Sequence, residues 1–290
     1  MIKDIVVSLS VGRPRDVAGD FAISVATAFD AHLSGVAFAY EPVIGGMLMP
    51  VPDASLLESF RTENSRAAQR AKREFDEATR RAGVRSDSIA LPATADEAAR
   101  RFGTIARDYD LSVLAQAEPD GDVSETLAIE AALFNSGRPV LVVPYIQSTG
   151  LKLDRVMVCW DGSRNAARAV ADAMPLVRRA GAIEVVTIES HERRNELAGA
   201  KIAEHLARHG LKVELKPIVA SDADVANTIL SHAADTAADL IVMGGYGHSR
   251  LREFILGGAT DGMLKSMTVP TLMAHWRATR FRSHHPSFRR

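Results

Sequence analysis

The chain contains one long pattern twice, and this internal duplication narrows the range of folds more than any other feature. An apolar run, IKDIVVSLS at 2–10, returns about 150 residues later as LDRVMVCWDGS at 153–163. Each run precedes an Ala-rich helical stretch and a second apolar run, and the halves close with RPVLVVPY and VPTLMAHW. Solenoid repeats are only ~20–50 residues long, so the sequence predicts a duplicated domain.

Within each copy, apolar runs alternate with helical patterns. Runs such as VMVC at 156–159 and LIVM at 240–243 are unbroken, as in strands of a parallel sheet buried on both faces. The first copy adds a long charged helix from about Ala54 to Ala82. Strands that alternate with helices require right-handed crossovers and a doubly wound sheet. We therefore expect an α/β fold of two tandem doubly wound domains, each with a five-stranded parallel sheet.

The domain boundaries follow from the same repeat. We place the first domain at 1–147 and the second at 154–276. The linker between them, QSTGLKLD at 147–154, is short and polar, which favours packing of the two halves against each other. The tail at 277–290 is basic and lacks periodicity, and we expect it to be a frayed terminus.

Composition excludes several classes of protein. The formal net charge of the 290-residue chain is -1, which gives no long-range attraction for nucleic acid or an anionic membrane. The single cysteine, Cys159, excludes an internal disulfide framework and a Cys-rich zinc site, and it suits a reducing compartment. The first apolar run is too short for a signal peptide, and no apolar run reaches ~18 residues. We expect a cytoplasmic protein with no membrane span and no nucleic-acid partner.

The order of the elements also predicts where a ligand binds. In an open α/β sheet, ligands bind beyond the carboxyl ends of the strands, where the strand order reverses. Three segments of the second copy meet there: 161–163 after its first strand, 187–188 at the end of its second, and the loop after its fourth. That loop lies within MGGYGHSRLREFILGGATDGML at 243–264, and it is the most informative stretch of the chain.

The residue types in this loop favour an anionic ligand. Gly244 and Gly247 permit a positive φ or a close approach of the backbone to a ligand. Gly257 and Gly258 lie where a helix begins, and free N–H groups and the helix dipole attract phosphates there. Further candidates for phosphate contacts are the hydroxyls of Ser249 and Thr260 and the positive charge of His248 or Arg250.

A resemblance to a known family becomes specific at this point. Gly244, Gly247 and Gly257 match G-x2-G-x9-G, which is similar to the nucleotide-binding signature of the universal stress protein family. The run VMVCWDGS resembles the family's first strand and its binding aspartate, Asp161, and VPTLMAH resembles the final strand used for pairing between domains. The resemblance covers nearly the whole chain as a tandem pair. It implies an adenine nucleotide alpha hydrolase-like fold and ATP, with or without Mg²⁺, as the ligand.

Carried over by position, the resemblance assigns roles to single residues. Asp161 and Ile188 face ribose or adenine, and the signature glycines face the phosphates. The remaining candidate site residues are Gly245, His248, Ser249, Gly258 and Thr260. Gly258 departs from the family, which usually has Ser or Thr there; the backbone N–H survives, and the lost hydroxyl contact is worth on the order of 0.5–1.5 kcal/mol. Thr260 matches the family's second hydroxyl position, and the sequence leaves metal ligands undefined.

The first copy departs from this pattern. It has Ser10 at the position of the binding aspartate, and no glycine pair follows its fourth strand. Glu118, Asp120 and Asp122 stand where phosphates would lie and would repel them. Asp122 and Glu125 match a capping box at the start of the next helix. We expect this half to be structural or to bind other proteins.

Several of these signals also have ordinary structural interpretations. The glycine-rich loop can be a set of tight turns, and Asp161 can belong to the N-cap region of the next helix. Cys159 reads as a buried strand residue. His205 and His209 are four residues apart, but without a third ligand they fit the solvated face of a helix better than a metal site.

The leading functional hypothesis is an ATP-binding universal stress protein that acts as a nucleotide-responsive stress or regulatory protein through its second domain. The alternative is an interaction protein that binds no nucleotide and uses both domains for dimerisation. A homodimer or an intramolecular domain pair, with unidentified protein partners, fits either hypothesis. An enzyme is less expected, because CWDGSRNA lacks the Ser-Gly-Gly-x-Asp-Ser loop of related ATP-consuming folds and no G-x-x-x-x-G-K-[ST] loop is present. At most, slow ATP hydrolysis remains.

Overall fold

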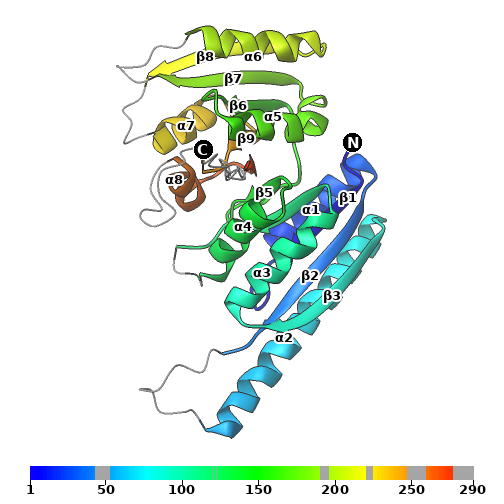
Figure 1. The fold of residues 1–290 in the computed structure, drawn as a ribbon. Helices are drawn as coiled ribbons and strands as arrows, with labels where there is room; N and C mark the ends of the chain where they lie inside the picture. Colours follow the sequence, from blue (N-terminus) through cyan, green and yellow to red (C-terminus); the bar gives the residue numbers. More distant parts are fainter. Residues whose placement is uncertain are drawn as a thin grey trace, which may run out of the picture.

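The computed structural model describes residues 1–42, 53–119, 121, 123–189, 196–219, 225–246 and 259–276. Its strands form a single ten-stranded sheet in the order β3-β2-β1-β4-β5-β10-β9-β6-β7-β8. The two halves of the chain therefore lie side by side along one sheet, as the colours of Figure 1 show.

The elements of the first half are β1 (Asp4–Ser8), α1 (Val17–Phe29), β2 (His32–Tyr40), α2 (Ala54–Ala82), β3 (Ser86–Ala93), α3 (Ala95–Ile105), the 3-10 helix η1 (Ala106–Asp108), β4 (Leu111–Ala115), α4 (Ser124–Asn135) and β5 (Val140–Val143). Those of the second half are β6 (Arg155–Cys159), α5 (Arg164–Val177), β7 (Ala182–Glu189), α6 (Glu196–Arg208), β8 (Val213–Val219), α7 (Val225–Asp235), β9 (Leu240–Gly244), α8 (Ala259–Ser266) and β10 (Thr271–Ala274).

Each half is a doubly wound five-stranded parallel sheet, as the sequence predicts. The first half has the strand order β3-β2-β1-β4-β5, and the second repeats it as β8-β7-β6-β9-β10. All neighbours within a half are parallel. The strand order therefore reverses between β1 and β4 and between β6 and β9. We call the side on which the strands of a half end the carboxyl edge of that half.

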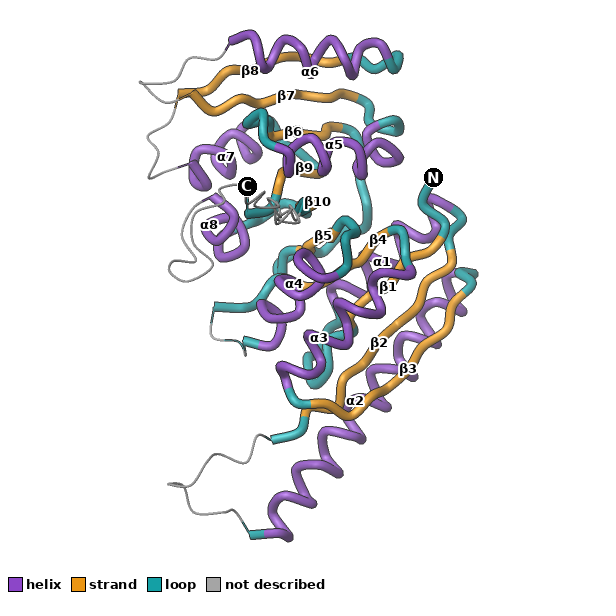
Figure 2. Tube along the Cα trace, viewed as in Figure 1, coloured by secondary structure: helices purple, strands orange, loops and turns teal. Residues whose placement is uncertain are grey.

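The two halves join through their final strands. β5 and β10 are antiparallel, with Leu141 opposite Leu272 and Val140 opposite Met273. The family resemblance implies that this strand pairs between domains, and the pairing occurs within one chain. Because the junction is antiparallel, the strands of the two halves end at opposite long edges of the continuous sheet. Figure 2 shows the strands of both halves following one another across this sheet.

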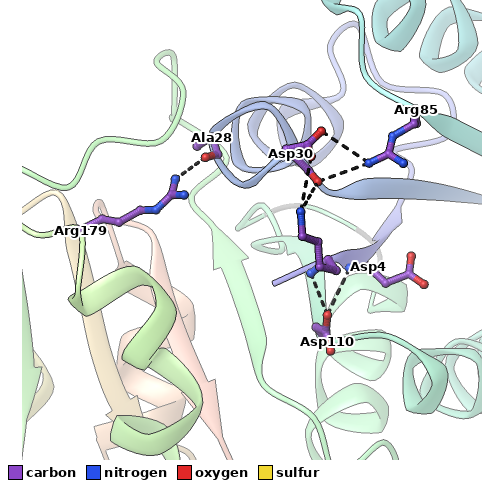
Figure 3. Close-up of polar contacts among 7 residues, drawn as sticks. Asp4, Ala28, Asp30, Arg85, Asp110 and Arg179 are labelled. Atoms are coloured by element: carbon purple, nitrogen blue, oxygen red, sulfur yellow. Dashed lines mark hydrogen bonds and ion pairs between the residues drawn. The ribbon is translucent and has the colours of Figure 1, made fainter. Parts of the chain in front are cut away.

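Side chains also connect the halves away from the sheet. The guanidinium of Arg179, just after α5, donates to the carbonyl of Ala28 in α1 and lies 4.0 Å over the ring centroid of Phe29. Beside this contact, Asp30 pairs with Lys3 and Arg85, which holds the C-terminal end of α1 against the starts of β1 and β3 (Figure 3). The halves are thus fixed to each other at more than one place.

The core consists of two apolar layers, one on each face of the sheet. One layer contains residues of α1, α2, α5 and α6, and the other contains residues of α3, α4, α7 and α8. Each layer includes strand residues from both halves, so the core continues across the β5–β10 junction. The unbroken apolar runs are buried from both sides: Val156, Met157 and Val158 are each 0% exposed. Among the described residues, no helix has both the length and the apolar character that crossing a membrane requires.

Candidate functional site

The turn after β6 presents Asp161 at the carboxyl edge of the second half. Trp160 N–H donates to the carbonyl of Val186 at 2.8 Å and continues the pairing with β7 for one more residue. The chain then turns through Gly162, whose φ of 74° lies in the left-handed region that suits glycine. The Asp161 carboxylate is exposed and accepts the N–H of Ser163 at 2.9 Å. One carboxylate oxygen thus shapes the turn while the group stays open to solvent.

Ser163, rather than Asp161, caps α5. The Ser163 Oγ accepts the N–H of Ala166 at 3.1 Å, the bond expected of an N-cap serine. The aspartate belongs to the region just before the cap, so its carboxylate does not close the helix. Helix α5 then runs to Val177 with Pro175 inside it.

Asn165 in the first turn of α5 links three chain segments. It is buried, and its Nδ2 donates to the carbonyls of Gly245 at 2.7 Å and Tyr246 at 3.2 Å. Its Oδ1 accepts the N–H of Trp276 at 2.8 Å. The side chain therefore fixes the loops after β9 and β10 to the start of α5. The sequence analysis did not identify Asn165; the available signal was an asparagine in the first turn of a helix, where its propensity is low.

Gly244 and Gly245 have different surroundings. A Cβ added to Gly244 would lie 2.6 Å from the backbone nitrogen of Ala166 and 2.8 Å from the carbonyl carbon of Asn165. The end of β9 therefore packs directly against the start of α5, which requires a glycine whatever the site binds. A Cβ on Gly245 would meet no atom closer than 3.6 Å, so this position has room for a side chain.

The residues on either side of the glycine-rich loop are held together. Tyr246 has a φ of 52°, and its N–H donates to Thr260 Oγ1 at 3.0 Å. Thr260 is 7% exposed and lies in the first turn of α8. The start of the loop and the start of α8 therefore meet beyond β9, at the point where the strand order reverses.

The structure thus places five of the ten candidate residues. Asp161, Gly244, Gly245 and Thr260 gather around the start of α5, linked through Asn165 and Tyr246. Ile188 lies near the end of β7 and is half-buried against the apolar layer of that face. The other five candidates, Gly247, His248, Ser249, Gly257 and Gly258, lie outside the described residues.

Comparison with known families agrees with this arrangement. The family described as the universal stress protein family matches residues 152–275. The second half of the chain is therefore similar to the universal stress protein family. The matched range contains β6 to β10 and all ten candidate residues.

A relative and two solved structures extend the comparison. A universal stress protein of Synechocystis sp. is 27% identical over 145 residues, which cover 47% of the chain and 46% of that relative, so the match spans about half of each. A universal stress protein structure from Archaeoglobus fulgidus has a TM-score of 0.67 at 16% identity, covering 94% of this chain and 96% of that one. A putative universal stress protein from Pseudomonas aeruginosa has a TM-score of 0.60 at 15% identity, with coverage of 94% and 93%. These structures share the fold over both halves.

The carboxyl edge of the first half of the chain is built differently. Leu9 N–H donates to the carbonyl of Val36, as Trp160 does to that of Val186, but the following loop is longer. It spans 10–15 before the N-cap Asp16, against 161–162 before Ser163. Ser10, at the position that corresponds to Asp161, donates its hydroxyl to Asp16 at 3.0 Å. Burial raises the pKa of the Asp16 carboxyl, against the hydrogen bonds from Gly19 and Ser10.

The longer loop carries Arg13 across this edge. Its guanidinium pairs with Glu118 at 2.9 Å and with Glu125 at 3.2 Å. The capping box predicted for Asp122 and Glu125 is therefore wrong for Glu125: the N-cap of α4 is Val123, which makes no side-chain cap bond. Glu125 instead contacts the guanidinium of Arg13, which is 112 residues away in the chain. Asp120 and Asp122 lie outside the described residues.

A cavity of about 400 Å³ lies beside Arg13 at this edge of the first half. Its polar side chains come from Ser8, Ser10, Arg13, Tyr40, Ser124 and Glu125. Of the two glutamates that pair with Arg13, Glu125 lines the cavity and places a negative charge there.

The remaining sequence candidates have structural roles. Cys159 ends β6, and burial, together with the charges of Asp161 and Glu184, raises the pKa of its thiol to about 12. His205 on α6 and His209 just after it are exposed, with ring centroids 4.9 Å apart. Within the part of the chain that the structure describes, no group of three or more His, Cys, Asp or Glu side chains could hold a metal ion.

Proposed function

We propose that this universal stress protein binds ATP, with or without Mg²⁺, at the carboxyl edge of its second half and acts as a nucleotide-responsive regulatory protein. The observation that carries the proposal is the bond between Tyr246 N–H and Thr260 Oγ1. It brings the first residues of the glycine-rich loop to the start of α8, beside the turn that presents Asp161. This is the part of a doubly wound sheet where ligands bind.

The chemistry of the described residues supports the proposal. The first N–H groups of α8 have no helical acceptor, and the positive end of the helix dipole favours a phosphate there. The exposed Asp161 carboxylate suits the hydroxyls of a ribose. We assign Gly247, His248, Ser249, Gly257 and Gly258 to the phosphates from the sequence signature.

The position of the two tryptophans allows a direct test. Trp160 precedes Asp161, and Trp276 binds Asn165 through its N–H, so both of the chain's tryptophans flank the site. ATP should change their fluorescence and saturate the change at or below millimolar concentration. Replacing Asp161 with Ala should weaken binding by roughly tenfold to a hundredfold, because a hydrogen bond to a charged group is worth about 1.5–3 kcal/mol.

Asp235→Ala is a matched control, because Asp235 is an exposed aspartate at the end of α7. It should bind ATP like the wild type. A wild-type protein whose fluorescence shows no saturation with millimolar ATP would rule out the proposed function. Release of phosphate from ATP well above the background rate would instead make the protein an enzyme.

The alternative, an interaction protein that only dimerises, has less support. Its simplest form pairs the final strands of two chains, but β5 and β10 already pair with each other. The proposed setting is the cytoplasm, which a single cysteine with a raised thiol pKa suits.

A further inference from the structure

Helix α4 runs from the carboxyl edge of the first half toward that of the second. Its first residues, Ser124 and Glu125, line the cavity of the first half. Because β5 and β10 are antiparallel, the start of β5 lies beside the end of β10. Helix α4 leads into β5, so it begins at the carboxyl edge of the first half and ends near that of the second. The last turns of α4 accordingly reach the loop that follows β9.

Three residues on one face of α4 contact the start of the glycine-rich loop. Glu130, Leu133 and Phe134 have the spacing i, i+3, i+4, which places them together on a helix surface. The Phe134 ring centroid lies 4.8 Å from that of Tyr246, and Glu130 Oε1 accepts the Tyr246 hydroxyl at 3.4 Å. The Leu133 side chain lies against Gly245, 3.6 Å from where a Cβ would be.

The same face of α4 also supports the end of β10. The Phe134 ring lies 4.8 Å from the ring of His275, edge to face. His275 Nδ1 in turn is 3.0 Å from the carbonyl of Gly245. Phe134 therefore lies against two segments of the second half that Asn165 binds from the other side.

A second contact from the first half holds the helix that follows the loop. Gln116, just after β4, is 2% exposed, and its Nε2 donates to the carbonyl of Leu264 in α8 at 2.9 Å. Carbonyls in the last turn of a helix have no helical partner, so this bond satisfies a group that α8 cannot satisfy itself. The Gln116 Oε1 accepts the N–H of Tyr145 at 3.3 Å, which fixes the orientation of the amide.

These contacts lie on both sides of the glycine-rich loop in the sequence. Tyr246 precedes the loop and is held by α4, and α8 follows it and is held by Gln116. Tyr246 keeps a left-handed φ of 52°, which a tyrosine adopts only when its surroundings impose it. The contacts that impose it include Glu130 and Phe134 of the first half.

We propose that the first half sets the nucleotide affinity of the second by holding both ends of the glycine-rich loop, with Glu130, Phe134 and Gln116 as positioning residues that do not touch the ligand. The inference rests on the proposed function and adds a regulation to it. Anything that moves α4 or the loop after β4 changes the affinity at the opposite edge of the sheet.

The test measures ATP affinity by tryptophan fluorescence in full-length variants. Phe134→Ala and Gln116→Ala should each raise the Kd for ATP by at least about fivefold, the lower end of typical coupling between sites. Phe134→Tyr keeps the ring and should restore affinity to within about twofold of the wild type. Asn135→Ala is the control on α4, because Asn135 is exposed beside Phe134 and should leave the Kd unchanged.

A second measurement does not depend on nucleotide. In the ligand-free protein, backbone hydrogen exchange in peptides that contain Tyr246 and 259–264 should be faster in Phe134→Ala and Gln116→Ala than in the wild type. Peptides from α6 serve as the internal reference. If Phe134→Ala fails to fold, Phe134→Leu and Glu130→Gln replace it, since both keep most of the side-chain volume.

The outcomes separate the two proposals. Wild-type binding with an equal Kd in all folded variants would overturn the inference and leave the proposed function standing. A wild type that binds no ATP would defeat the proposed function, and the exchange data would then decide whether the first half holds the loop ends. Faster exchange in both variants would support the inference, and unchanged exchange would overturn it.

Discussion

Glu130 is partly buried, carries a carboxyl group and contacts the second half through Tyr246. Burial raises the pKa of its carboxyl, the negative charge of Asp261 raises it further, and the hydrogen bond with Tyr246 opposes both. Burial, followed by the Glu130 charge and hydrogen bond, also raises the pKa of the Tyr246 hydroxyl. The phenol therefore stays protonated and remains the donor in this pair at any pH near neutrality.

The raised pKa of Glu130 makes the stability depend on pH in a definite direction. A carboxyl with a higher pKa in the folded state contributes stability below its unfolded pKa of about 4.3, and this contribution is lost as pH rises through the folded value. Relative to Glu130→Gln, the wild type should therefore become progressively less stable from about pH 4 upward. Urea unfolding of both proteins across this range measures the difference, in which other carboxyls cancel. A difference that is constant or grows with pH would contradict the prediction.

Cys159 provides a second test at the scale of one side chain. A thiol with a pKa of about 12 contains almost no thiolate at pH 8, whereas an unfolded cysteine with a pKa of about 8.5 contains a substantial fraction. Iodoacetamide should therefore label Cys159 very slowly in the native protein and rapidly in denaturant, as mass spectrometry can follow. Equal labelling rates in the two states would show that the thiol is accessible and activated.

At the scale of elements, the joint between β9 and α5 determines the geometry of the site. The two elements approach so closely that the backbone of Gly244 contacts the backbone of Asn165 and Ala166. Asn165 then uses its amide to hold Gly245, Tyr246 and Trp276. A strand end, a helix start and two loops are thus held together by one side chain.

The two neighbouring glycines should respond differently to the same substitution. Gly244→Ala forces a methyl group to within 2.6 Å of a backbone nitrogen, so it should lower the free energy of unfolding by about 1–3 kcal/mol, as overpacking does. Gly245→Ala meets no atom closer than 3.6 Å and should cost less than about 1 kcal/mol. Chemical denaturation of the pair gives the comparison. Equal losses would mean that the close approach of β9 and α5 does not constrain the site.

At this scale, some features follow from local sequence patterns and others do not. The strands and the helix Ala54–Ala82 were predictable because each depends on a local apolar or charged pattern. The cap at Ser163 follows from local chemistry as well. Asn165, Gln116 and the pairing of Glu125 with Arg13 were not predictable, because their partners lie 80 or more residues away in the chain. Such a partner comes near only when the sheet forms, so a local sequence pattern does not reveal it.

At the scale of the whole molecule, the sheet begins and ends with similar strands. β3 and β8 are its outer edges, and each contains a proline, Pro92 and Pro217. A proline lacks the N–H that further pairing requires, so both edges resist the addition of another strand. The strands most suited to pairing, β5 and β10, are already paired inside the chain.

The shared sheet predicts that the two halves unfold together. Both tryptophans lie in the second half, so their fluorescence follows that half, and hydrogen exchange of β1 and β2 peptides follows the first. Both signals should give the same denaturant midpoint, as in a two-state transition. Leu272→Ala removes a fully buried side chain at the junction of the halves and should lower both midpoints together. Separate midpoints for the two signals would show that the halves are independent.

The antiparallel meeting of β5 and β10 has one more consequence. It places the arginine-bridged cavity of the first half and the end of β9 at opposite long edges of the continuous sheet. A macromolecule that docks over the cavity meets the first turn of α4, whereas the last turns of α4 contact Tyr246. Under the proposed function, docking at one edge and ATP binding at the other would then affect each other along α4 and through the Gln116 amide.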